Sequence, residues 1–228
     1  MKQKNYPIYK TTFIDDMRSL VEEAAQNFSD KTAISFKEKP TDKEVTKISF
    51  TQWRDDVRSL GTALIAKGLR EKNIALLGEN SYGWCCSFFA IMGSGSVVVP
   101  VDKDLAVEDI LGIINATECE AVIFGKTAEA KLKEMLGGAF PESVRLIISI
   151  PDKCSIDATA AGSRSLITLK DLETEGAKLY AGGDNSYYDY KIDPHKLGSI
   201  VYTSGTTGKG KGVMLSQMNI GLDMTLGM

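Results

Sequence analysis

The residues of this chain that are best equipped for chemistry lie in one Gly-rich segment near its C-terminal end. Residues 202–213 read Tyr-Thr-Ser-Gly-Thr-Thr-Gly-Lys-Gly-Lys-Gly-Val and follow an apolar stretch. Glycine admits backbone conformations that turn N–H groups toward an anion, and the hydroxyl and ammonium groups add further donors. A plain surface loop would need the glycines but not two lysines placed after an apolar strand. The segment therefore predicts a phosphate-binding loop.

A nucleotide-hydrolase P-loop is one alternative for this segment. Gly205, Gly210 and Lys211 fit the Walker A pattern, but Gly212 stands where that pattern needs a Mg²⁺-binding Ser or Thr. A Walker lysine also opens a helix, whereas residues 212–215 have the apolar pattern of a second strand. We therefore expect strand, loop and strand, and a helix over 211–222 would favour the hydrolase instead.

The loop resembles the signature of the adenylate-forming, AMP-binding enzymes, which include acyl-CoA synthetases, luciferases and the adenylation domains of peptide synthetases. The likeness runs from Tyr202 to Val213, with Gly210 at a position where the family usually has Pro. Residues 215–219 read Leu-Ser-Gln-Met-Asn, so Gln217 replaces the family's usual His. The resemblance places that position toward the substrate region.

A second passage, residues 73–102, is also similar to this family. Its Asn80-Ser81-Tyr-Gly-Trp84 run and its Val-Pro100-Val-Asp102 run look most like bacterial long-chain fatty-acid CoA ligases. The resemblance covers most of residues 45–228. The chain is identified as the N-terminal part of such an enzyme.

The resemblance implies a two-step reaction that uses ATP, Mg²⁺ and CoA. A small-molecule carboxylic acid, most simply a fatty acid, attacks the α-phosphorus of ATP, and the CoA thiol then displaces AMP. The phosphates would be held by hydroxyls, by backbone N–H groups that glycines leave accessible, and by one ammonium. The residues concerned are Thr203, Ser204, Gly205, Thr206, Thr207, Gly208 and Lys211.

Other parts of the machinery follow this loop in relatives, namely the adenine pocket, the metal-binding Glu, the ribose-binding Asp and the catalytic Lys. We therefore expect no catalytic residue and no metal ligand within residues 1–228, and no activity from this piece alone. The acid that is activated, and whether the acceptor is CoA or a carrier protein, are left open.

Composition fits an enzyme of the cytoplasm. The net charge of −3 gives no basic footprint for nucleic acid, and 43% hydrophobic content can bury a substantial core. No apolar run has membrane-spanning length and no secretion signal is visible, so any membrane contact would be peripheral and made through a fatty-acid substrate. The cysteines, which include the adjacent Cys85 and Cys86, show no metal spacing, and His195 is expected at the surface. The sequence gives no expectation for oligomeric state.

Alternating apolar strands and helices predict an α/β fold, with a parallel sheet covered by helices on both faces. Strands are expected at 73–77, 97–101, 120–124 and 144–150, and helices at 82–94, 106–115 and 127–136. Residues 1–70 should add a helix over 12–28, a small hairpin of 33–36 with 47–50, and a helix that Thr51 caps and Gly68 ends. The expected divisions are 1–70, a core at 71–150, a linker at 151–197 with one small strand and a helix near 169–179, and 198–228 with the loop.

Two further functions stay open beside the acid–CoA ligase and the P-loop hydrolase. One is an adenylation domain for an amino acid or an aryl acid, which would share the loop. The other is a non-catalytic, flavodoxin-like binding module that uses its sheet to contact a partner.

Overall fold

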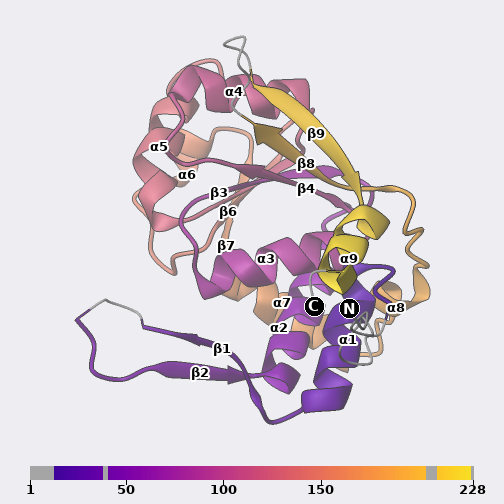
Figure 1. Cartoon of the computed structure of the whole chain (residues 1–228). Coiled ribbons are helices and arrows are strands. Elements are labelled where there is room, and N and C mark those ends of the chain that lie inside the picture. Colours follow the sequence, from indigo (N-terminus) through magenta and orange to yellow (C-terminus); the bar gives the residue numbers. More distant parts are fainter. Residues whose placement is uncertain (1–12, 38–40, 204–209, 227–228) are drawn as a thin grey trace, which may run out of the picture.

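A mostly parallel sheet forms the centre of the molecule (Figure 1). The computed structural model describes residues 13–37, 41–203 and 210–226. The strand order in these residues is β7-β6-β5-β3-β4-β8-β9, and all neighbours are parallel except β8 and β9. The strands are β3 (Asn73–Leu77), β4 (Val97–Val101), β5 (Ala121–Phe124), β6 (Leu146–Ser149), β7 (Ser165–Thr168), β8 (Leu197–Thr203) and β9 (Lys211–Ser216). The expected α/β fold is confirmed.

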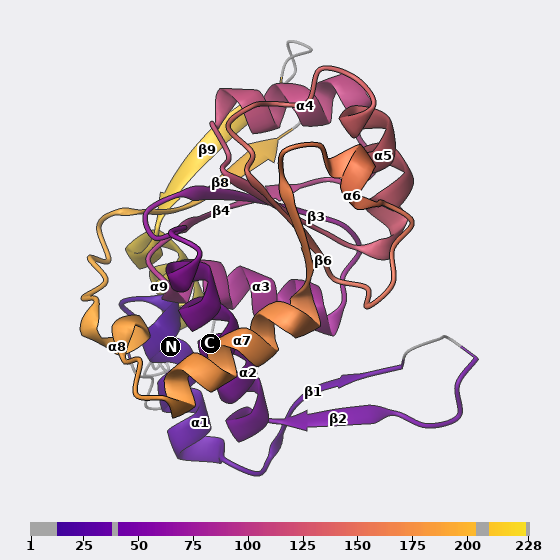
Figure 2. The same cartoon turned by 180° about the vertical axis from the view of Figure 1, so that it is seen from behind.

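Helices cover both faces of the sheet, as Figures 1 and 2 show. One face carries α1 (Met17–Phe28), α2 (Phe50–Ala66), α3 (Tyr82–Gly93), α7 (Leu169–Ala181) and α9 (Gln217–Leu226). The other carries α4 (Val107–Ala116), the turn η1 (Lys126–Ala128), α5 (Glu129–Leu136) and the short α6 (Ala158–Ala161). Because the central strands are apolar on both faces, each layer closes its own core, one around Leu76 and Ile123 and the other around Leu77 and Val122.

Residues 151–197 contribute to the same body. Strand β7 pairs with β6 at the edge of the sheet, and α7 packs directly on α2. The approach is close enough that a Cβ on Gly176 of α7 would lie only 1.8 Å from the Ser59 carbonyl oxygen. The short helix α8 (Ser186–Asp189) then inserts the buried Tyr187 against Gly61 of α2 and Gly93 of α3. The expected small strand and helix are present, and the proposed divisions along the chain stay a prediction.

The N-terminal elements differ from the expectation at two helix starts. Helix α1 begins at Met17, because the Asp16 carboxylate, which is buried, caps it by accepting from the Ser19 N–H (2.9 Å). Helix α2 is capped by Ser49, not Thr51, through the Gln52 N–H (3.1 Å). It ends as predicted at Gly68, which has a φ of +72°.

The predicted hairpin is confirmed as β1 (Thr32–Phe36) and β2 (Thr46–Ser49), which pair antiparallel. It is tied to the body where the ring of Phe36 stacks on Tyr82, with 5.6 Å between centroids.

Candidate phosphate site

The candidate site lies at the tip of the β8–β9 hairpin. The two strands pair antiparallel, and Thr203 and Lys211 face each other as the pair nearest the tip. Both side chains are exposed. The predicted order of strand, loop and strand is therefore confirmed, and the structure contradicts the Walker arrangement, because residues 211–216 form a strand rather than the start of a helix.

Five of the predicted phosphate-binding residues lie outside the described residues: Ser204, Gly205, Thr206, Thr207 and Gly208. The structure thus places only the two ends of the motif. Their assigned contacts with phosphate stay a prediction.

The tip of the hairpin lies at the carboxyl-terminal edge of the sheet. Strand β8 runs parallel to β4, with Val98 opposite Ser199, so the end of β8 at Thr203 points toward the same edge of the sheet as the carboxyl end of β4. In open α/β sheets ligands bind at this edge. The exposed tip therefore lies at the edge where sheets of this kind bind their ligands.

Polar contacts join two segments at this edge of the sheet. The Glu79 carboxylate, which follows β3, accepts hydrogen bonds from the Lys126 N–H (3.1 Å), the Thr127 N–H (3.0 Å) and the Thr127 hydroxyl (2.5 Å). Burial opposes ionisation of this carboxyl, but the hydrogen bonds outweigh burial and lower its pKa. Glu79 therefore stays ionised and ties the end of β3 to the turn after β5.

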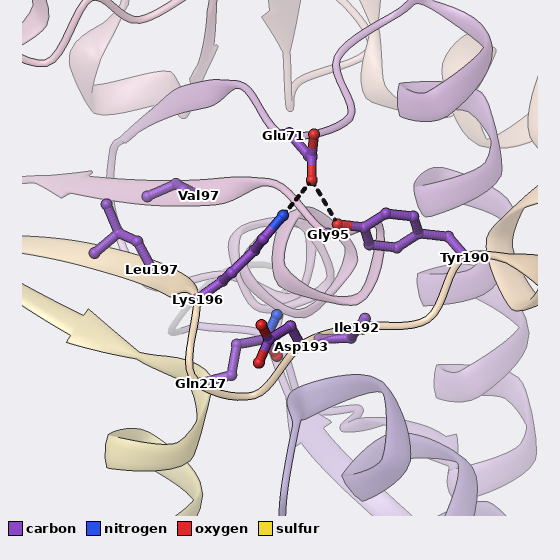
Figure 3. Close-up of a pocket in the computed structure, with 9 residues that line it drawn as sticks. All are labelled: Glu71, Gly95, Val97, Tyr190, Ile192, Asp193, Lys196, Leu197 and Gln217. Atoms are coloured by element: carbon purple, nitrogen blue, oxygen red, sulfur yellow. Dashed lines mark hydrogen bonds and ion pairs between the residues drawn. The ribbon is translucent and has the colours of Figure 1, made fainter.

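The opposite end of the hairpin borders a hollow of about 270 Å³. Figure 3 shows its lining, where the Glu71 carboxylate accepts from Lys196 Nζ (2.8 Å) and from the Tyr190 hydroxyl (2.9 Å). The hollow lies at the amino-terminal ends of β4 and β8, so it does not coincide with the predicted phosphate site.

Gln217, which the resemblance places toward the substrate region, forms part of the lining of this hollow, at the end of the hairpin opposite Thr203 and Lys211. The residue is 3% exposed, and its side chain hydrogen-bonds the backbone of α1 and α3. The sequence singled out Gln217 only as a replacement for the family's usual His, and it gave no indication of these distant partners.

Other candidate groups behave as ordinary structural residues. His195 is exposed, as expected. Cys85, Cys86, Cys119 and Cys154 are free thiols, and burial raises the pKa of Cys119 to about 11. In the part of the chain that the structure describes, no three His, Cys, Asp or Glu side chains gather into a group that could hold a metal ion. Over the same ranges, every helix is too short or too polar to span a bilayer.

Comparison with known proteins places this geometry in a family. The family described as AMP-binding enzyme matches residues 21–227. A medium-chain-fatty-acid–CoA ligase of Ectopseudomonas oleovorans is 28% identical over 199 residues, which are 87% of this chain and 34% of that protein. A chloroplastic long-chain-fatty-acid–[acyl-carrier-protein] ligase of Arabidopsis thaliana is 28% identical over 209 residues, which are 86% of this chain and 27% of that protein. The chain thus spans about a third or less of the length of these relatives.

Solved structures agree on the fold. A long-chain-fatty-acid–CoA ligase from Archaeoglobus fulgidus superposes with a TM-score of 0.72 at 19% identity, over 99% of this chain and 42% of that one. The adenylation domain of a carboxylate reductase from Mycobacterium chelonae gives a TM-score of 0.76 at 21% identity, over 95% of this chain and 36% of that one. The strand after the loop contradicts the hydrolase alternative, and the family match over residues 21–227 favours an AMP-binding enzyme over the flavodoxin-like module. The chain belongs to the AMP-binding enzyme family.

Proposed function

We propose that this chain supplies the phosphate-binding part of a ligase that activates a carboxylic acid with ATP and passes the acyl group to CoA. The observation that carries the proposal is the pairing of Thr203 with Lys211, which brackets the signature motif at the exposed tip of a hairpin. The family match over residues 21–227 supports this assignment. The seven predicted residues are its proposed ligands for ATP.

The chemistry of the first step explains the residue types. As the carboxylate attacks the α-phosphorus, the bond to pyrophosphate breaks and negative charge grows on the leaving phosphates. The Lys211 ammonium would offset that charge, and the hydroxyls of Thr203, Ser204, Thr206 and Thr207 would donate to the phosphate oxygens. Gly205 and Gly208 would let the backbone approach. Fixed donors of this kind are typically worth about 10²–10³ in rate each.

The described residues offer no cluster of carboxylates for the Mg²⁺ that the family resemblance implies. We therefore propose no metal-binding role for the described residues of this chain. The adenine, ribose and metal contacts belong to parts of the ligase that this chain does not supply, so we propose that residues 1–228 alone are inactive.

A fatty acid is the proposed substrate. Both relatives described above are named for fatty acids, one with CoA and one with a carrier protein as acceptor. An aryl-acid or amino-acid substrate is the alternative, since an anthranilate–CoA ligase shares the fold with a TM-score of 0.72. The cytoplasmic location stays a prediction.

Carboxylate-dependent exchange of pyrophosphate into ATP tests the proposal. The product of the complete gene is assayed with straight-chain acids from acetate to palmitate and with benzoate and anthranilate. We expect exchange that is fastest with a fatty acid, and none from the 228-residue chain. Exchange that needs no acid, or is absent with every acid, would contradict the proposal, and exchange by the 228-residue chain would contradict its inactivity.

A further inference from the structure

The side chain of Gln217 joins three elements that are far apart in the sequence. Its Oε1 accepts a hydrogen bond from the Met17 N–H (3.0 Å), and its Nε2 donates to the Met92 carbonyl oxygen (2.9 Å). Gln217 follows directly on β9, Met17 begins α1 and Met92 lies in the last turn of α3. One amide therefore fixes the end of the hairpin strand to two helix termini.

The Met17 N–H depends on Gln217 for its partner, whereas the Met92 carbonyl oxygen also accepts from the Gly95 N–H (3.0 Å). The first N–H groups and the last carbonyls of a helix have no partner within it, and burying them unpaired is costly. Because Gln217 is 3% exposed, water has little access to replace its amide. Loss of the Gln217 amide would thus leave the N–H of the buried Met17 without its partner.

The neighbouring strand is shaped to receive this side chain. A Cβ on Gly198, near the start of β8, would lie 2.7 Å from Gln217 Cγ and 3.1 Å from Met92 Cε. Any larger residue at position 198 would displace the amide. Gly198 and Gln217 thus form a fitted pair at the base of the hairpin.

The hairpin has few other backbone ties to the sheet. Strand β4 pairs with β3 along Asn73–Leu77, but it pairs with β8 only where Val98 faces Ser199. Seven residues of β8 extend roughly 20 Å from that base to Thr203 at the tip. Beyond Ser199 the strand is held by side-chain packing, as at the buried Ile200, so we expect a shift at the base to pass along β8 to the tip.

We propose that Gln217 is a positioning residue for the phosphate loop: by pinning the base of the β8–β9 hairpin to α1 and α3, it sets where Thr203 and Lys211 present the loop. This inference rests on the proposed function. Gln217 lies at the opposite end of the hairpin from Thr203 and Lys211, so we expect it to act on the loop through the hairpin. The amide is therefore expected to affect the use of ATP more than the use of the acid.

The test compares Gln217→Met with two controls in the product of the complete gene. Gln217→Met keeps the side-chain length but removes both hydrogen bonds. Gln52→Met makes the same chemical change at an exposed residue whose Nε2 donates to Asp56 (2.7 Å). Asn73→Ala removes a hydrogen bond from Asn73 Nδ2 to the Thr117 carbonyl oxygen (2.6 Å). Asn73 lies on β3, which β4 separates from the hairpin, so this variant provides a destabilised reference.

The first readout is the KM for each substrate in the pyrophosphate exchange assay. The second is backbone hydrogen exchange along Lys211–Ser216, measured with enough denaturant to bring the variants to equal global stability. For Gln217→Met we expect the KM for MgATP to rise about tenfold and the KM for the acid to change less than about twofold, since loss of one or two buried hydrogen bonds is worth about that much. Exchange in β9 should accelerate about tenfold more than in either control.

A KM for MgATP that stays within about twofold of wild type, or an equal rise in Asn73→Ala, would overturn the inference. If the wild-type protein shows no pyrophosphate exchange, the proposed function fails and hydrogen exchange alone decides the role of Gln217. In that case unchanged protection of β9 in Gln217→Met would refute the positioning role of Gln217, and faster hydrogen exchange confined to the hairpin would support it.

Discussion

Replacement of Glu173 by Gln should remove a pH dependence of stability that this one carboxyl creates. Glu173 lies on α7, mostly buried where α7 packs over α2. Burial, and then the negative charges of Asp56 and Asp152, raise the pKa of Glu173 from 4.5 to about 7. Around it, Asp56 accepts from the Tyr82 hydroxyl (2.6 Å), and Asp152 pairs with Lys170 (3.6 Å).

The sign of the effect follows from the raised pKa. The folded protein holds this proton more tightly than the unfolded chain, so the stabilising contribution is full below pH 4.5 and is lost as the pH rises to about 7. The rise in pKa corresponds to at most about 3 kcal/mol, and solvent screening of the partly exposed carboxyl reduces the expected loss to about 1–2 kcal/mol. Above about pH 8 the loss is complete.

Urea unfolding at pH 5, 6, 7 and 8 measures this effect. Between pH 5 and 8 the wild-type free energy of unfolding should fall by about 1–2 kcal/mol more than that of Glu173→Gln. Groups common to both proteins, including His195, cancel in the comparison. The matched control is Glu175→Gln, on the same helix as Glu173, which removes the ion pair of Glu175 with Lys67 (2.7 Å). It should leave the dependence of the unfolding free energy on pH as in the wild type. Parallel profiles for wild type and Glu173→Gln would refute the reasoning.

Three other substitutions have definite expected outcomes. Gly176→Ala should lower the free energy of unfolding by about 3 kcal/mol or more, because its Cβ would overlap the Ser59 carbonyl oxygen; a loss under about 1 kcal/mol in urea unfolding would contradict the packing. Ser199→Ala should raise it by about 1 kcal/mol, because the buried Ser199 hydroxyl has no partner in the described part of the chain; a lower melting temperature would argue against this. Lys211→Ala should leave stability within about 0.5 kcal/mol by urea unfolding, since the side chain is exposed; a larger loss would show that it packs.

The central strands were predictable because their signal is local. Strands β3 and β4 begin and end at the expected residues, since short Val-, Ile- and Leu-rich runs between polar or glycine residues leave little choice. Helix α1 was less predictable at its start. Phe13 fits the apolar spacing of that helix but is 50% exposed. The helix starts only after the Asp16 cap, and apolar periodicity carries no information about a cap.

The site divides in the same way. The motif predicted a loop between two strands, because the residue types themselves favour a turn, and the structure adds that Thr203 and Lys211 pair at its ends. The role of Gln217 could not be read locally, since its partners Met17 and Met92 lie 200 and 125 positions away. Nor did composition reveal that Tyr187 would fill the space left by Gly61 and Gly93, because that fit arises only when three helices meet.

The central claim, that this hairpin presents a phosphate-binding loop of an acid-activating ligase, is tested most directly by one substitution. Acid-dependent pyrophosphate exchange is measured for Lys211→Ala and for Lys191→Ala, which removes the same charge from an exposed position before β8. Lys211→Ala should slow exchange by about tenfold or more, while Lys191→Ala stays at the wild-type rate. An undiminished rate in Lys211→Ala would contradict the account.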